Sequence, residues 1–204
     1  MLEPRGAGWR NPGSWYLLGG LSLVALSLWM PWWTAARTAR IELRADQLAR
    51  LLLRAAAQPI PPALADEVDH VFARFLASAI AEGLVVGDLE RHEPDTEGVL
   101  LLLTNKHYAL QLAVSPPEAT EVVGRDTVPA LEVVAWPLRA NGPAHSVYFH
   151  PENAPAAYTR NLSNSTVELG NKRPQPGACH RRRTGLFDSP SSYRSANDDR
   201  WIVF

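Results

Sequence analysis

The feature that most constrains this chain is a long apolar stretch near its start. No charged residue lies between Arg10 and Arg37. A helix needs roughly 20 apolar residues to cross the about 30 Å of hydrocarbon in a bilayer, and this stretch is long enough. We therefore expect a transmembrane helix over residues 15–34 that is retained as a signal anchor. A short disordered tail over residues 1–14 is expected to precede it.

Aromatic residues flank both ends of this stretch. Indole and phenol rings favour the headgroup zone of a bilayer, which makes lipid the first expected partner. The residues predicted to anchor the chain in this way are Trp15, Tyr16, Trp29, Trp32 and Trp33. Two alternatives are a cleaved signal peptide, with small residues available at positions 34–36, and a buried helix of a soluble protein.

The side of the membrane on which the rest of the chain lies is open to two interpretations. Only Arg5 and Arg10 precede the stretch, whereas five arginines follow it closely: Arg37, Arg40, Arg44, Arg50 and Arg54. Because cytoplasmic flanks carry the excess of positive charge, this count favours a cytoplasmic C-terminal part. This count is weaker evidence for the orientation if these arginines belong to a packed helix.

An amphipathic helix is predicted to follow over residues 35–58, as a stalk for the rest of the chain. Its apolar residues recur in steps of three and four, which places them on one face: Ile41, Ala45, Leu48, Leu52 and Ala55. This face packs either on its own domain or on a partner protein. Prolines end the helix, and a second helix is expected over residues 63–82, stopped by Gly83.

The remaining pattern is typical of β-structure and completes an α+β head domain over residues 59–204. A short strand is predicted over residues 84–86, and alternating or continuous apolar runs predict an antiparallel sheet of hairpins. The strands are expected over residues 99–103, 107–114, 131–138 and 144–149, with Asn141-Gly142 as the turn of the second hairpin. Residues 150–190 lack periodicity and predict a loop-rich C-terminal region, followed by a final strand over residues 201–204.

Composition excludes several classes of function. The 204 residues carry a net charge of −1, which offers no large basic field for nucleic acid. The single cysteine, Cys179, excludes an intrachain disulfide framework. Cys179-His180 is the most reactive-looking pair, but adjacent side chains diverge and no nucleophile motif surrounds them. We therefore predict no catalytic residue, metal site or cofactor, and a non-enzymatic protein.

Arginines provide the one candidate ligand site. A run of three could bind an anion such as a phosphate group, and a fourth lies upstream. The candidate residues are Arg160, Arg181, Arg182 and Arg183. A membrane-tethered anion-binding or sensory domain is therefore the alternative function.

The order of elements resembles that of a type IV pilin or a type II secretion pseudopilin. Ala35–Ala57 is similar to the half of the pilin helix that packs on the sheet, and Tyr193-Arg194-Ser195 with Asp198-Asp199 resembles the C-terminal loop of the major pseudopilins. Gly13–Leu18 lacks the Phe and Glu of the pilin processing motif. The resemblance implies a structural or assembly protein whose stalk helix and extracytoplasmic head contact partner proteins.

Overall fold

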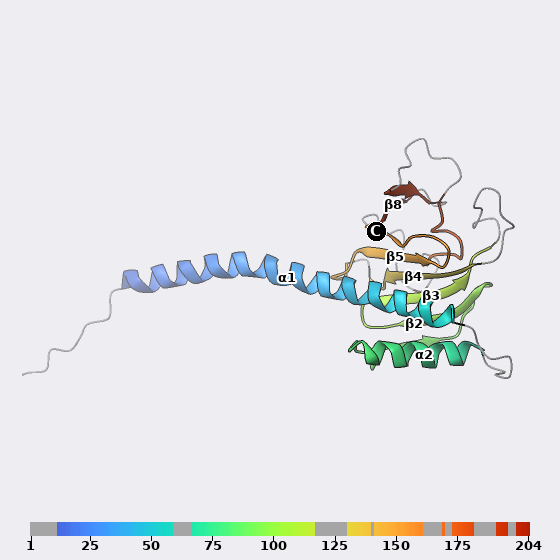
Figure 1. Cartoon of the computed structure of the whole chain (residues 1–204). Coiled ribbons are helices and arrows are strands. Elements are labelled where there is room, and N and C mark those ends of the chain that lie inside the picture. Colours follow the sequence, from blue (N-terminus) through green and yellow to red (C-terminus); the bar gives the residue numbers. More distant parts are fainter. Residues whose placement is uncertain are drawn as a thin grey trace, which may run out of the picture. The chain divides into compact units, whose positions relative to one another are not determined.

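A computed structural model describes residues 12–58, 67–116, 130–139, 141–160, 169, 173–181, 191–195 and 199–204. The chain forms two compact units, Met1–Ala39 and Arg40–Phe204. The described residues have an α+β layout, with two helices and one antiparallel sheet of eight strands (Figure 1). The elements are α1 (Pro12–Ala56), α2 (Glu67–Ala81), β1 (Glu90–His92), β2 (Val99–Thr104), β3 (Tyr108–Val114), β4 (Leu131–Pro137), β5 (Ser146–Pro151), β6 (Ala157–Arg160), β7 (Ser192–Arg194) and β8 (Arg200–Val203).

The expectation of a transmembrane helix over residues 15–34 is wrong. This stretch is part of α1, which continues through Pro31, and no helix among the described residues is both long and apolar enough to cross a membrane. The stretch lacks charge, but glycine, serine and proline interrupt its leucines and contribute little apolar transfer energy. The prediction was therefore wrong because it considered only the absence of charge.

The predicted amphipathic helix is present as the C-terminal part of α1. Its buried residues are Ala45, Leu48, Ala49, Leu51, Leu52 and Ala55, and they share one core with Val71, Phe75 and Ala79 of α2. This core lies against one face of the sheet, where Leu103, Leu110 and Val133 contribute to it. Gly83 ends the second helix with φ of 73°, as predicted.

The sheet follows the chain almost strand by strand, in the order β1-β2-β3-β4-β5-β6-β8-β7. The two predicted hairpins are confirmed, and both belong to this one sheet. Asn105 makes the first turn, because its Oδ1 accepts hydrogen bonds from the backbone N–H groups of His107 and Tyr108 at 2.8 Å each. The strand expected over residues 84–86 is not formed, and the three-residue strands β1 and β7 were not predicted.

A second core covers the opposite face of the sheet. It contains Trp136 of β4 and Phe149 of β5, together with Cys179, Tyr193 and Trp201 from the C-terminal region. The predicted final strand is confirmed as β8, and the region expected to be rich in loops also contains the short strand β6. The C-terminal region therefore closes the face of the sheet that the helices leave uncovered.

Candidate functional site

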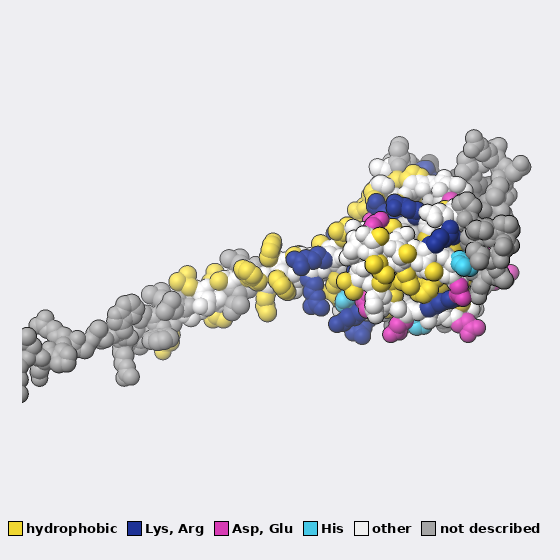
Figure 2. Space-filling view, turned by 60° about the horizontal axis from the view of Figure 1, so that its bottom comes forward, with side chains coloured by type: hydrophobic (Ala, Val, Ile, Leu, Met, Phe, Trp, Pro, Cys, Tyr) yellow, Lys and Arg dark blue, Asp and Glu magenta, His cyan; other side chains and the backbone are white. Residues whose placement is uncertain are grey.

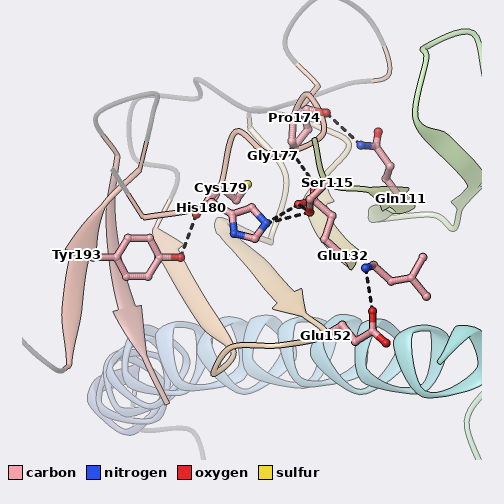
Figure 3. Close-up of polar contacts among 10 residues, drawn as sticks. Gln111, Ser115, Glu132, Glu152, Pro174, Gly177, Cys179, His180 and Tyr193 are labelled. Carbon is pink, nitrogen blue, oxygen red and sulfur yellow. Dashed lines mark hydrogen bonds and ion pairs between the residues drawn. The ribbon is translucent and has the colours of Figure 1, made fainter. Parts of the chain in front are cut away.

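The most densely bonded group of buried polar side chains joins the sheet to the segment 173–181 (Figure 3). Ser115 follows β3, Glu132 lies on β4, and both point to the face opposite the helices because side chains alternate along a strand. The Oγ of Ser115 donates to Glu132 Oε2 at 2.5 Å, and His180 Nε2 lies 2.8 Å from the same oxygen and 3.0 Å from Ser115 Oγ. These three side chains form the buried triad.

Glu132 is the centre of the buried triad, and its side chain is fully buried. Its second oxygen, Oε1, accepts the backbone N–H of Gly177 at 2.8 Å. A buried carboxylate is tolerated only when hydrogen bonds replace its water, and both oxygens of Glu132 meet this condition. Gln111 adds a parallel contact, because its Nε2 donates to the carbonyl of Pro174 at 3.2 Å. Together these bonds hold the segment 173–181 on the sheet.

The buried triad is not arranged for nucleophilic catalysis. In a hydrolase relay the two ring nitrogens of the histidine serve different partners, whereas here His180 Nε2 contacts both Ser115 and Glu132. Ser115 is fully buried as well, so a substrate cannot reach its hydroxyl. The geometry supports a clamp within the fold.

Cys179, the most reactive-looking residue of the sequence, lies beside the triad. Burial, and then the negative charges of Glu132 and Asp199, raise the pKa of its thiol well above the usual value. Because the thiolate is the nucleophile, this thiol is held in its unreactive form. Its main-chain carbonyl accepts the hydroxyl of Tyr193 at 3.0 Å, and burial likewise raises the pKa of that tyrosine.

The four arginines proposed for anion binding are only partly described. Arg160 lies exposed at the end of β6. Arg181 is exposed where the chain forms an isolated bridge with Ser195, and Arg182 and Arg183 lie outside the described residues.

Arg160 belongs instead to a surface that the sequence did not reveal. Cross-strand partners share a face of a sheet, and the register pairs Tyr148 with Tyr158, Tyr158 with Ile202, and Arg194 with Arg200. This is the face on which α1 and α2 pack over the earlier strands. We name its part on β6, β7 and β8 the basic face; its members are Tyr158, Arg160, Arg194, Arg200, Ile202 and Phe204.

Two acidic residues of α1, Glu42 and Asp46, bind β5 and the turn before it. Glu42 Oε1 accepts hydrogen bonds from the backbone of His145 and from both the backbone and the hydroxyl of Ser146. Asp46 is buried; one oxygen lies 2.8 Å from His150 Nε2 and the other 2.9 Å from Arg50. The ion pair between Asp46 and Arg50 therefore belongs to a larger contact between α1 and the sheet.

The N-terminal part of α1 exposes large apolar side chains (Figure 2). We call Tyr16–Trp33 the apolar segment; of its large apolar side chains that the structure describes, eight are more than half exposed, namely Tyr16, Leu21, Leu23, Val24, Trp29, Met30, Trp32 and Trp33. Successive residues of a helix are offset by about 100°, so these positions surround the helix. Four of the five residues predicted to anchor the chain are among them, and the side chain of Trp15 lies outside the described residues.

The described residues contain no group of three or more His, Cys, Asp or Glu side chains that could hold a metal ion. The buried triad was hard to predict, because Ser115 and His180 lie 17 and 48 positions from Glu132. One signal was available, a glutamate within the otherwise apolar run Leu131–Trp136. Comparison with protein families, with curated proteins and with solved structures finds no match for this chain.

Proposed function

We propose that this chain is a non-enzymatic assembly component that joins other copies of itself through the apolar segment of α1. The observation that carries the proposal is the exposure of eight large apolar side chains between Tyr16 and Trp33. A helix that is apolar on all sides is stable only when it is surrounded by apolar material. Helices of other copies supply that environment without a membrane.

The energetics favour such an association. Complete burial of all eight side chains would contribute on the order of 12–24 kcal/mol, at about 1.5–3 kcal/mol each. Association costs about 4–15 kcal/mol in lost freedom of motion. The apolar segment therefore carries enough surface to drive a helical bundle.

The polar side chains of the apolar segment and the residue after it also suit a buried helix. Ser27 donates its hydroxyl to the carbonyl of Val24 at 2.8 Å. Thr34 donates to the carbonyls of Met30 at 3.1 Å and Pro31 at 2.9 Å. Because these hydroxyls are satisfied within the helix, burying them against a neighbouring helix leaves no donor unpaired. The packing of Arg40–Ala56 on an antiparallel sheet supports the pilin-like character of this proposal.

The test is the mass of the full-length protein in solution, measured by sedimentation velocity over a dilution series. We expect the unmodified chain to form assemblies whose mass falls on dilution. A full-length variant with Leu21→Gln, Leu23→Gln, Val24→Gln and Met30→Gln should sediment at a lower mass than the unmodified chain, because it loses apolar area on several sides of the helix.

The matched control replaces two equally exposed apolar residues outside the segment, Leu43→Gln and Ile80→Gln, which are 57% and 61% exposed. This control should assemble as the unmodified chain does. Equal assembly by the control and the four-residue variant would contradict the proposal, and so would a monomeric unmodified chain.

A further inference from the structure

The basic face lies at one end of the sheet. Arg160, Arg194 and Arg200 are all exposed, and among the described residues of β6, β7, β8 and their flanks Asp199 and Glu152 are acidic. Two acidic residues of α1 lie over the neighbouring strand β5: Glu42 binds Ser146, the cross-strand partner of Arg160, and Asp46 is paired with Arg50. No ion pair joins Arg160 or Arg200 to another described residue. Arg160 and Arg200 therefore present their guanidinium groups to solvent.

Apolar side chains lie among these arginines. Ile202 is 42% exposed and Phe204 is 49% exposed. The ring of Phe204 packs against three neighbours. Its centroid lies 5.6 Å from that of the Tyr158 ring, 6.2 Å from that of the His150 ring and 5.3 Å from the guanidinium carbon of Arg50. Arginine and aromatic residues together are the groups most enriched in protein interfaces.

The opposite end of the sheet carries the opposite charge. We name Glu90, Glu93 and Glu97, in and after β1, the acidic edge; all three are exposed. The nearby carboxylates Asp69 and Asp95 are paired with Arg91 and Arg173. No such pair joins the three glutamates to any residue in the part of the chain that the structure describes.

The acidic edge and the basic face cannot meet within one copy. Strand order places β1 at one end of the sheet and β7 at the other, and Figure 1 shows β2, the neighbour of β1, on the far side of the sheet from β8. Charged edges normally keep sheets apart because like charges repel. Here the two ends differ in sign, so the ends of two copies attract each other.

We propose that one copy of this chain binds the next head to tail, with the acidic edge of one copy on the basic face of its neighbour. This inference rests on the proposed function, since it names a second contact in the same assembly. A contact between unlike surfaces leaves one free surface of each kind at the ends, so it extends into an open chain of copies. Exposed ion pairs are screened by salt, so the contact weakens as salt is added.

The experiment uses two full-length variants. The edge-reversed chain carries Glu90→Arg, Glu93→Arg and Glu97→Arg, and the face-reversed chain carries Arg160→Glu, Arg194→Glu and Arg200→Glu. Each variant alone has two ends of one sign, so we expect its self-association to weaken by at least about tenfold at low salt. An equal mixture of the two variants should regain assembly, because every acidic end then meets a basic one.

Sedimentation velocity at low and high salt measures these masses, and circular dichroism confirms that each variant is folded. A control with Lys106→Glu and Arg139→Glu reverses two exposed charges outside both surfaces and should assemble normally. If a reversed chain fails to fold, Glu90→Gln, Glu93→Gln and Glu97→Gln remove the acidic edge with less disturbance and should weaken assembly as well.

Three outcomes would overturn the inference. The first is normal assembly by both reversed chains, and the second is a mixture of the two that regains no assembly. The third is impairment of the face-reversed chain alone, which would assign the basic face to a different partner. The proposed function fails separately: assembly that survives the four glutamine substitutions in the apolar segment but is lost in the reversed chains would leave the head-to-tail contact standing alone.

Discussion

His150 Nε2 lies 2.8 Å from Asp46 Oδ1, and this contact ties strand β5 to helix α1 across 104 positions of sequence. Both side chains are buried. The other oxygen of Asp46 binds Arg50 at 2.9 Å. One carboxylate therefore satisfies a donor on the sheet and a donor on its own helix, and it fixes how α1 lies on β5.

Replacement of Asp46 by alanine should destabilise the protein by about 3 kcal/mol, because it leaves a buried polar partner without its acceptor. The measurement is urea unfolding of the full-length chain. Arg54→Ala is the control, since Arg54 forms a largely exposed pair with Glu82 at 3.6 Å, and exposed pairs contribute about 0–1 kcal/mol. Equal losses of unfolding free energy in the two variants would show that the contact of Asp46 with His150 contributes no more than an exposed ion pair.

Glu132→Ala should cost about 3 kcal/mol or more, because the substitution orphans the hydroxyl of Ser115, the N–H of Gly177 and the ring of His180. Ser115→Ala should cost only about 1 kcal/mol, since it removes the hydroxyl that contacts Glu132 and His180 but leaves Glu132 with its bonds to Gly177 and His180. Urea unfolding gives both values. The clamp role also predicts that the chain around Gly177 becomes sensitive to protease in Glu132→Ala before global unfolding. Protection equal to that of the unmodified chain would contradict it.

Cys179 should resist alkylation in the folded protein. Its pKa is raised and its side chain is buried, so at mildly alkaline pH the reactive thiolate is scarce and inaccessible. Labelling with iodoacetamide should be slow in buffer and fast in urea. Cys179→Ser provides the blank, and labelling of the folded chain at the rate of a free thiol would rule out this description.

Stability should decrease at high pH. Burial raises the pKa of Tyr148 from 10.0 to about 12, and raises those of Tyr108 and Tyr193 further. The folded state thus holds protons that the unfolded state releases, so the stabilisation is complete below pH 10 and is lost as pH rises from there through the folded pKa values. Unfolding by urea across this range measures the loss, and tyrosinate absorbance of Tyr148→Phe should lack the step near pH 12.

Periodic patterns predicted the elements that have a strong local signal. The stripe of Leu48 and Leu52 identified the packing face of α1, and the apolar runs around Asn105 identified a hairpin. The strands β1 and β7 have three residues each, which is too short for any alternation to be visible. Their place in the sheet depends on pairing with distant strands.

The candidate sites were less predictable for a related reason. Asp46 lies among residues that are polar in sequence, and its burial is decided by His150 on a strand far along the chain. Arg160, Arg194 and Arg200 come together only through strand register. The transmembrane prediction failed because it counted charges in residues 15–34 and gave too little weight to their glycine, serine and proline content.

The strand order carries a consequence for the route by which this chain folds. Each strand from β2 to β6 pairs with the strand that precedes it in the chain. Such local pairing costs little chain entropy and proceeds quickly. β8 must instead find β6 from about forty residues away, and α1 must find β5 across an even greater separation. The meander should therefore form early as a nucleus, and the helix and the last strand should dock onto it afterwards as the slow steps.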